Sequence, residues 1–262
     1  MTGDPPEEYA RAADDGPLRG RNIDLSPWAR ASSFPCPFGA CDGNGFVLDD
    51  DSNVARPCRC RDQRIALAKS KSLDHEIPKK FQHVGFDRFP VTEMDPALVR
   101  GVRAYCSRID EMIDKGQGIW FSGERGTGKT TLAMLISQHA LRAHRSVAIY
   151  TAPRLLAEIR NTFESDARQS YDQLMERLRA VELLHIEDLA VARTTEWVLE
   201  QFYTVVNDRY QDERAILFTA DVDPPSALAE HVGGRTYSRL IEMCGDPILM
   251  YGADRRLQQF GV

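Results

Sequence analysis

The sequence has no apolar run that approaches the roughly 20 residues needed to cross a bilayer. Its first residues, MTGDPPEE, lack both the basic start and the apolar centre of a signal peptide. Basic residues are not in excess either: 39 acidic and 33 basic residues give a formal net charge of −6. This balance excludes a wholly basic, histone-like binding to nucleic acid, but it leaves room for a local basic face. We expect a cytoplasmic protein without membrane partners.

Cysteine is scarce, and four of the six cysteines lie close together as Cys36-x4-Cys41 and Cys58-x-Cys60. Cytoplasmic thiols are normally reduced, so such a cluster favours a metal over disulfides. Zn²⁺ takes four tetrahedral ligands, which two turns with close pairs of thiolates can supply. The Cys-x-Cys spacing is tighter than the common two-residue gap. We predict a four-cysteine zinc site, with an Fe–S cluster, unliganded thiols or a redox role as the alternatives.

Residue composition and apolar periodicity change twice along the 262 residues, which divides the sequence into three segments. Residues 1–33 are rich in Pro, Gly, Asp and Arg without apolar periodicity, which predicts a disordered leader. Residues 34–75 are predicted to form the cysteine module and a polar linker helix, and the module is too short to bury a core without a metal. Residues 76–262 are predicted to form one ATPase domain.

Strands and helices alternate in this last segment, which is typical of a parallel sheet covered by helices on both faces. The sequence predicts an α/β fold with a five-stranded parallel sheet. The expected strands are 118–122, 146–151, 183–186, 215–220 and 248–251. The expected helices are 96–115, 129–143, 153–162, 170–180, 194–210, 224–230 and 234–243.

A glycine-rich loop follows the first expected strand and matches the P-loop pattern G-x-x-x-x-G-K-[ST] in full. Its glycines let backbone N–H groups turn inward around phosphate oxygens. Lys129 is expected to reach the β- and γ-phosphates, and the Thr130 hydroxyl to bind Mg²⁺. The predicted nucleotide-binding residues are Gly123, Glu124, Arg125, Gly126, Thr127, Gly128, Lys129, Thr130 and Thr131.

Two acids end the strand expected beside the P-loop strand. We predict that Glu187 holds Mg²⁺ and that Asp188 polarises the attacking water. The usual order of such acids is Asp then Glu, and here it is reversed. His185, on the same strand, is interpreted as a core or sheet-face histidine rather than a catalyst.

Asp221 follows the fourth expected strand, where Asn is the commoner residue because it adds no negative charge. Asp221 either orients the attacking water or caps the helix that starts near Asp223. Arg235 and Arg239 lie four apart and share a helix face. Spacing alone favours surface ion pairs for these arginines over an arginine finger.

Residues 77–256 resemble the DnaC/DnaI/IstB group of AAA+ ATPases, which comprises helicase loaders and transposition helpers. The resemblance rests on the segments 77–78, 86–89, 118–121, 187–189, 218–221 and 234–243. It implies an ATP- and Mg²⁺-dependent ATPase without a large C-terminal lid. It also implies that Arg239 is a finger acting on a neighbouring subunit, with Arg235 supporting the interface.

The resemblance further implies single-stranded DNA contacts from the segment 153–180, although its arginines alternate with acids as on an ordinary solvated surface. We expect an ATPase that loads a replicative helicase onto single-stranded DNA, with the N-terminal module gripping the helicase. The alternatives are a transposition helper and an ATP-switched binding module that hardly hydrolyses ATP.

Overall fold

The computed structural model describes residues 36–49, 54–61, 64, 77–190 and 193–255. The predicted leader and nearly all of the predicted linker helix lie outside these residues. The chain divides into two compact units, residues 1–60 and 61–262. The boundary that we predict between residues 75 and 76 stays a prediction.

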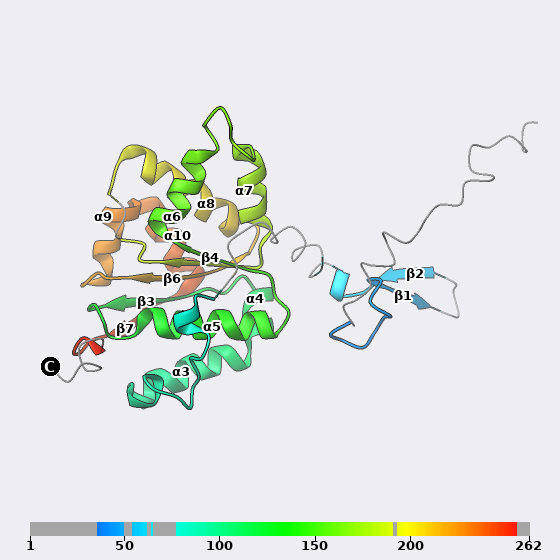
Figure 1. The fold of residues 1–262 in the computed structure, drawn as a ribbon, viewed down its shortest axis with the longest axis horizontal. Coiled ribbons are helices and arrows are strands. Elements are labelled where there is room, and N and C mark those ends of the chain that lie inside the picture. Colours follow the sequence, from blue (N-terminus) through cyan, green and yellow to red (C-terminus); the bar gives the residue numbers. More distant parts are fainter. Residues whose placement is uncertain (1–35, 50–53, 62–63, 65–76, 191–192, 256–262) are drawn as a thin grey trace, which may run out of the picture. The chain divides into compact units, whose positions relative to one another are not determined.

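The first unit contains a small antiparallel hairpin (Figure 1). Strand β1 (Phe46–Asp49) pairs with β2 (Val54–Pro57), and Phe46 lies opposite Pro57. The loop before the hairpin turns sharply at Gly39, which has a φ of 60°, a region that glycine enters without steric cost. The backbone N–H of Gly39 donates to the carbonyl of Cys36, so the turn closes around the first cysteine.

The second unit is built on the predicted five-stranded parallel sheet. Its strands stand in the order β4-β5-β6-β3-β7, and all four neighbouring pairs are parallel. The strands are β3 (Ile119–Gly123), β4 (Val147–Thr151), β5 (Leu183–Glu187), β6 (Ala215–Ala220) and β7 (Ile248–Met250). Strands β3, β5 and β6 are buried along their whole length, because helices cover both faces of the sheet. The expectation that the strand ending in Glu187 lies beside the P-loop strand is wrong, because β6 stands between β5 and β3.

Two groups of helices cover the sheet (Figure 1). One face carries α3 (Pro96–Ser107), α4 (Ile109–Asp114) and α5 (Lys129–Arg142). The other carries α6 (Ala152–Asn161), α7 (Tyr171–Ala180), α8 (Glu196–Gln211), α9 (Leu228–Val232) and α10 (Gly234–Cys244). Each group encloses its own apolar core, as expected for a three-layer α/β fold.

The structure differs from the expected helices in two places. The single helix predicted for 96–115 is two helices, because Arg108 has a φ of −114° and a ψ of 23° and interrupts the helix. Its start is as expected: Asp95 caps it by accepting from the N–H groups of Ala97 and Leu98. The helix predicted for 224–230 is a 3₁₀ turn, Pro225–Ala227, followed by the short α9.

Arg209 fixes the edge of the sheet at which β5 and β6 begin. This fully buried guanidinium donates to the carbonyls of Leu178, Val181, Glu182 and Ala215. The bonds tie the end of α7 to Glu182, directly before β5, and to Ala215, the first residue of β6. The opposite ends of these strands meet the P-loop. Within the described residues, no helix is long and apolar enough to cross a membrane.

Candidate active site

The P-loop connects β3 to α5 at the carboxyl edge of the sheet, as the sequence predicts. Gly123 has a φ of 127°, and a Cβ added there would lie 2.2 Å from the carbonyl oxygen of Met250. A Cβ on Gly126 would lie 2.0 Å from the Asp254 carboxylate. Gly128 precedes α5 without a side-chain cap, so the first N–H groups of the helix point toward an anion site. Gly126 and Gly128 also have positive φ values, 75° and 107°, a region that glycine enters without steric cost.

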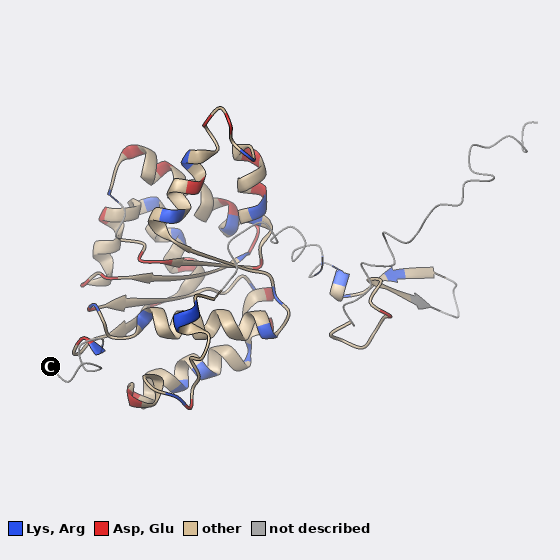
Figure 2. Cartoon of the chain, in the orientation of Figure 1, with Lys and Arg blue, Asp and Glu red and all other residues tan. Residues whose placement is uncertain are grey.

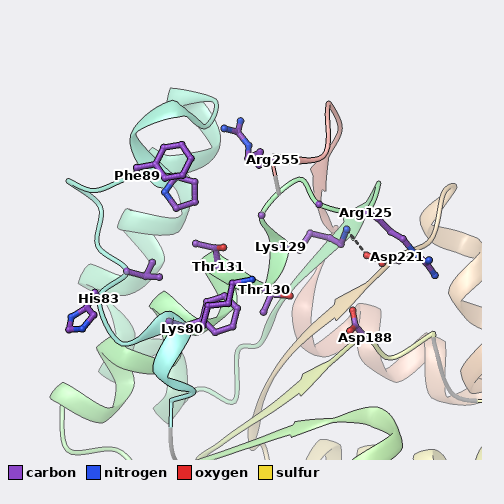
Figure 3. A pocket seen from close by; sticks show the side chains of 15 residues that line it. Lys80, His83, Phe89, Arg125, Lys129, Thr130, Thr131, Asp188, Asp221 and Arg255 are labelled. Carbon is purple, nitrogen blue, oxygen red and sulfur yellow. Dashed lines mark ion pairs between the residues drawn. The ribbon is translucent and has the colours of Figure 1, made fainter. Parts of the chain in front are cut away.

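Lys129 points into this loop and is already engaged by oxygen atoms. Its Nζ lies 3.0 Å from the carbonyl oxygen of Gly123 and 2.5 Å from that of Glu124. It also forms an ion pair of 2.6 Å with Asp221, drawn as a dashed line in Figure 3. The other oxygen of Asp221 lies 3.2 Å from Nε of Arg125. Asp221 is therefore paired with the Lys129 ammonium group, which a nucleotide phosphate would need as its own partner.

Glu187 lies beside Thr130, as a shared Mg²⁺ site requires. Its Oε2 accepts from the hydroxyl groups of Thr130, at 2.7 Å, and Thr219, at 2.9 Å. Its Oε1 lies 2.6 Å from Nε2 of His185. Burial acts to raise the pKa of Glu187, but the hydrogen bonds from His185, Thr130 and Thr219 outweigh it and hold the pKa below its ordinary value. The carboxylate is thus ionised and suited to a divalent cation.

Asp188 faces the same cavity from the end of β5 (Figure 3). Its φ is 55°, in the left-handed region, which Asp enters more readily than longer side chains. Its N–H donates to the Thr219 hydroxyl at 3.0 Å. This geometry gives a local reason for the reversed acids, since the longer Glu187 reaches Thr130 and the shorter Asp188 tolerates the turn.

The cavity in front of the P-loop has a volume of about 630 Å³, within the range of small-molecule sites. One wall comes from the segment before α3, which sequence reasoning did not assign to the site. Its lining residues there are Lys80, Phe81, His83, Val84, Phe89 and Pro90. The side-chain amide of Gln138 on α5 donates to the Phe81 carbonyl at 2.5 Å and fixes this wall.

Arg255 is a further residue of the cavity that the sequence did not reveal (Figure 3). Its backbone N–H donates to the Gly126 carbonyl at 3.0 Å, and its guanidinium donates to the Glu93 carbonyl at 3.0 Å. The chain after β7 thereby brings a cation against the P-loop. No motif at residue 255 gave a signal for this contact.

Arg235 and Arg239 lie on α10, and neither is among the described residues that line the cavity. The Arg239 guanidinium stacks over the rings of Tyr203, at 4.7 Å, and Tyr210, at 5.6 Å. Arg235 is exposed. Within one chain, the structure does not bring the predicted finger to the P-loop.

The four clustered cysteines of the first unit meet at one point. Their sulfur atoms all lie within 4.8 Å of one another, with Cys36 and Cys58 at 3.7 Å and Cys41 and Cys60 at 3.5 Å. A tetrahedral zinc site with Zn–S bonds of about 2.3 Å separates its sulfur atoms by about 3.8 Å, so the arrangement fits Zn²⁺. None of the four forms a disulfide.

Two thiols of the cysteine cluster, Cys36 and Cys60, have pKa values shifted in opposite directions. Burial acts to raise the pKa of Cys36, but backbone hydrogen bonds from Ala40, Phe38 and Cys41 bring it down to about 6. Burial and hydrogen bonds with neighbouring cysteines raise the pKa of Cys60. At least one thiolate is therefore prepared for a metal at neutral pH.

The chain is similar to several proteins, some of which are DNA-replication proteins by name. Residues 102–242 match the family model described as the bacterial DnaA ATPase domain. The chain is 26% identical over 235 residues to the phage-like element PBSX protein XkdC of Bacillus subtilis, covering 84% of this chain and 83% of XkdC. It is 23% identical over 148 residues to the replicative helicase loader DnaC of Buchnera aphidicola subsp. Schizaphis graminum, covering 56% of this chain and 59% of DnaC.

A solved structure agrees in fold. The replication initiator DnaA bound to AMPPCP and single-stranded DNA superposes with a TM-score of 0.52 at 18% identity, over 65% of this chain and 53% of that one. The likeness supports the three-layer ATPase fold described above.

Proposed function

The chain belongs to the family described as the bacterial DnaA ATPase domain and resembles the DnaC/DnaI-like AAA+ helicase loaders. On that premise we propose that it binds and hydrolyses ATP with Mg²⁺ to load a replicative helicase onto single-stranded DNA. The observation that supports this most strongly is the joint placement of Lys129, Thr130 and Glu187 at one edge of the sheet. A complete P-loop beside a buried, ionised acid is the arrangement that phosphoryl transfer needs.

In this proposal the triphosphate lies along the P-loop and the base packs against the segment before α3. Phe81 and Phe89 offer apolar surface to the base, while Lys80 and Arg255 add positive charge to the cavity. Thr130 and Glu187 would hold Mg²⁺, which supplies charge neutralisation on the phosphate oxygens. Asp188 would hold the attacking water, with its backbone fixed by Thr219.

Arg239 would complete the site of a neighbouring subunit. Its absence from the cavity lining within one chain and its place on the partly exposed side of α10 both support a role in trans. Arginine fingers raise the rate by about 10³ to 10⁵. Exposed Arg235 would then lie at the same subunit contact.

Single-stranded DNA would run along α6 and α7, which carry residues of both charge signs (Figure 2). Arg160 stacks on Trp197 at 4.9 Å, an arrangement that can also receive a nucleobase. The four-cysteine module, with exposed Phe38 and Val54, would contact the helicase. The DnaC and DnaA proteins reported above are replication proteins by name, and they lend no support to the transposition-helper alternative.

A loading assay tests this proposal. The partner helicase and the full chain are mixed with circular single-stranded DNA and ATP, and helicase bound to the circle is measured after gel filtration. We expect loading to depend on the chain and on ATP, and to be lost with Lys129→Ala. ATP-dependent helicase binding with turnover below detection would favour the ATP-switched binding module instead. Loading that is unaffected by the chain would contradict the proposal.

A further inference from the structure

A continuous run of hydrogen bonds links the middle of α5 to the expected Mg²⁺ ligand. Ser137 Oγ lies 2.9 Å from Nδ1 of His185, and Nε2 of His185 lies 2.6 Å from Oε1 of Glu187. Glu187 in turn accepts from Thr130, which lies in the first turn of the same helix. His185 and Glu187 stand two apart on β5, so their side chains share the sheet face that α5 covers.

These groups are shut off from water. Ser137 and His185 have no exposed surface, and Glu187 is 3% exposed. An imidazole in such surroundings is costly unless both of its nitrogens have partners, and here both have one. An ionised carboxylate only accepts hydrogen bonds, so Nε2 of His185 must donate to Glu187. Nδ1 is paired with the Ser137 hydroxyl, so both ring nitrogens are held in place.

We propose that His185 is a positioning residue that aims Glu187 at the Mg²⁺ site, with Ser137 setting the orientation of its ring. This inference rests on the proposed function, because it takes Glu187 as the Mg²⁺ ligand. His185 holds Oε1 and leaves Oε2 directed at the Thr130 hydroxyl. A glutamate has one more rotatable bond than the aspartate usual at this position, so it loses more side-chain freedom when it is ordered. The histidine supplies the restraint that the longer side chain needs.

Two substitutions of His185 separate this role from a purely structural one. His185→Gln places a side-chain amide near the former Nε2 and can still donate to Glu187. His185→Asn places its amide near the former Nδ1, so it can reach Ser137 but not Glu187. Both variants replace a buried ring by a smaller amide, so both lose packing contacts and should lower stability. They differ in the hydrogen bond that they keep: His185→Gln keeps the one to Glu187, and His185→Asn keeps the one to Ser137.

The readout is the Mg²⁺ concentration that gives half-maximal binding of a fluorescent, non-hydrolysable ATP analogue to the full chain, with thermal unfolding measured in parallel. We expect His185→Asn to need about tenfold more Mg²⁺, in line with the effect of removing a residue that orients a metal ligand. His185→Gln should stay within about threefold of wild type, as expected if a donor at Nε2 is what matters. Ser137→Ala should shift the requirement in the same direction as His185→Asn, but by less.

Leu184→Ala is the control on the same strand. Leu184 is buried in the apolar core on the other face of the sheet, so its loss should lower stability without changing the Mg²⁺ requirement. Equal Mg²⁺ requirements for the Gln and Asn variants would overturn the inference. Failure of this inference can be distinguished from failure of the proposed function. If the proposed function is wrong, Lys129→Ala will bind the analogue as wild type does.

Discussion

Replacing Asp221 by Asn should tighten ATP binding, because Asp221 competes with phosphate for Lys129. The carboxylate lies 2.6 Å from Nζ of a lysine that is 5% exposed, and Asp221 itself is 17% exposed. In the nucleotide-free chain this ion pair must open before Lys129 can reach a phosphate. The negative charge would also remain close to the γ-phosphate after binding.

The size of the effect follows from the strength of the contact. Hydrogen bonds to charged groups contribute about 1.5 to 3 kcal/mol. Because Asp221 is partly exposed to solvent, we take the lower value of about 1.5 kcal/mol, which corresponds to about a tenfold lower Kd for ATP. Asn can still donate to a phosphate or a water molecule, so the substitution removes charge without removing hydrogen-bonding capacity.

Isothermal titration of ATP in the presence of Mg²⁺ measures the change directly. Asp223→Asn is the matched control: it removes the same charge two residues away, from a carboxylate whose partner is the Tyr251 hydroxyl at 3.2 Å. We expect its Kd to stay near wild type. An Asp221→Asn variant with unchanged or weaker ATP affinity would refute the view that this ion pair opposes nucleotide binding.

Three further predictions concern the metal, the subunit contact and stability. Purified chain should contain about one Zn²⁺ by elemental analysis, lost in Cys58→Ser but retained in Cys106→Ser; absence of zinc from freshly purified, reduced protein would speak against the four-cysteine site. Arg239→Ala and Lys129→Ala should each lack turnover and regain some ATPase activity when mixed, and no recovery in mixtures that co-assemble would argue against a role in trans. Arg209→Met should lower the free energy of unfolding by about 3 kcal/mol in urea, because four buried carbonyls lose their donor; a loss below about 1 kcal/mol would show that the carbonyls find other partners.

The sheet was predictable because its strands are short apolar runs separated by amphipathic helices and glycine-rich turns. The P-loop was predictable for a different reason: its chemistry needs glycine at fixed places, and the added Cβ at Gly123 or Gly126 would overlap other atoms. The break in the first helix at Arg108 was not predictable, since no Gly or Pro marks it.

The less predictable part of the site consists of contacts between segments far apart in the sequence. From β6, the Thr219 hydroxyl accepts from the N–H of Asp188 and donates to the Glu187 carboxylate. Thr219 lies in the segment 218–221 that carries the family resemblance, but its role was not inferred from it. Arg255 approaches the P-loop after β7 and stands in no recognisable motif. His185 was interpreted correctly as buried on a sheet face, but its bond to Glu187 was missed. The i, i+2 spacing on a strand was the available signal, because it places two side chains on one face.

The measurement that tests the central claim most directly is the titration of ATP with Mg²⁺ into the wild-type chain, Lys129→Ala and Arg142→Ala. The two variants remove a positive charge from opposite ends of α5, but only Lys129 faces the cavity. The account predicts that wild type and Arg142→Ala bind ATP with similar affinity, whereas Lys129→Ala shows no saturable binding and unfolds at a temperature close to that of wild type. Wild-type ATP affinity in a folded Lys129→Ala variant would contradict it.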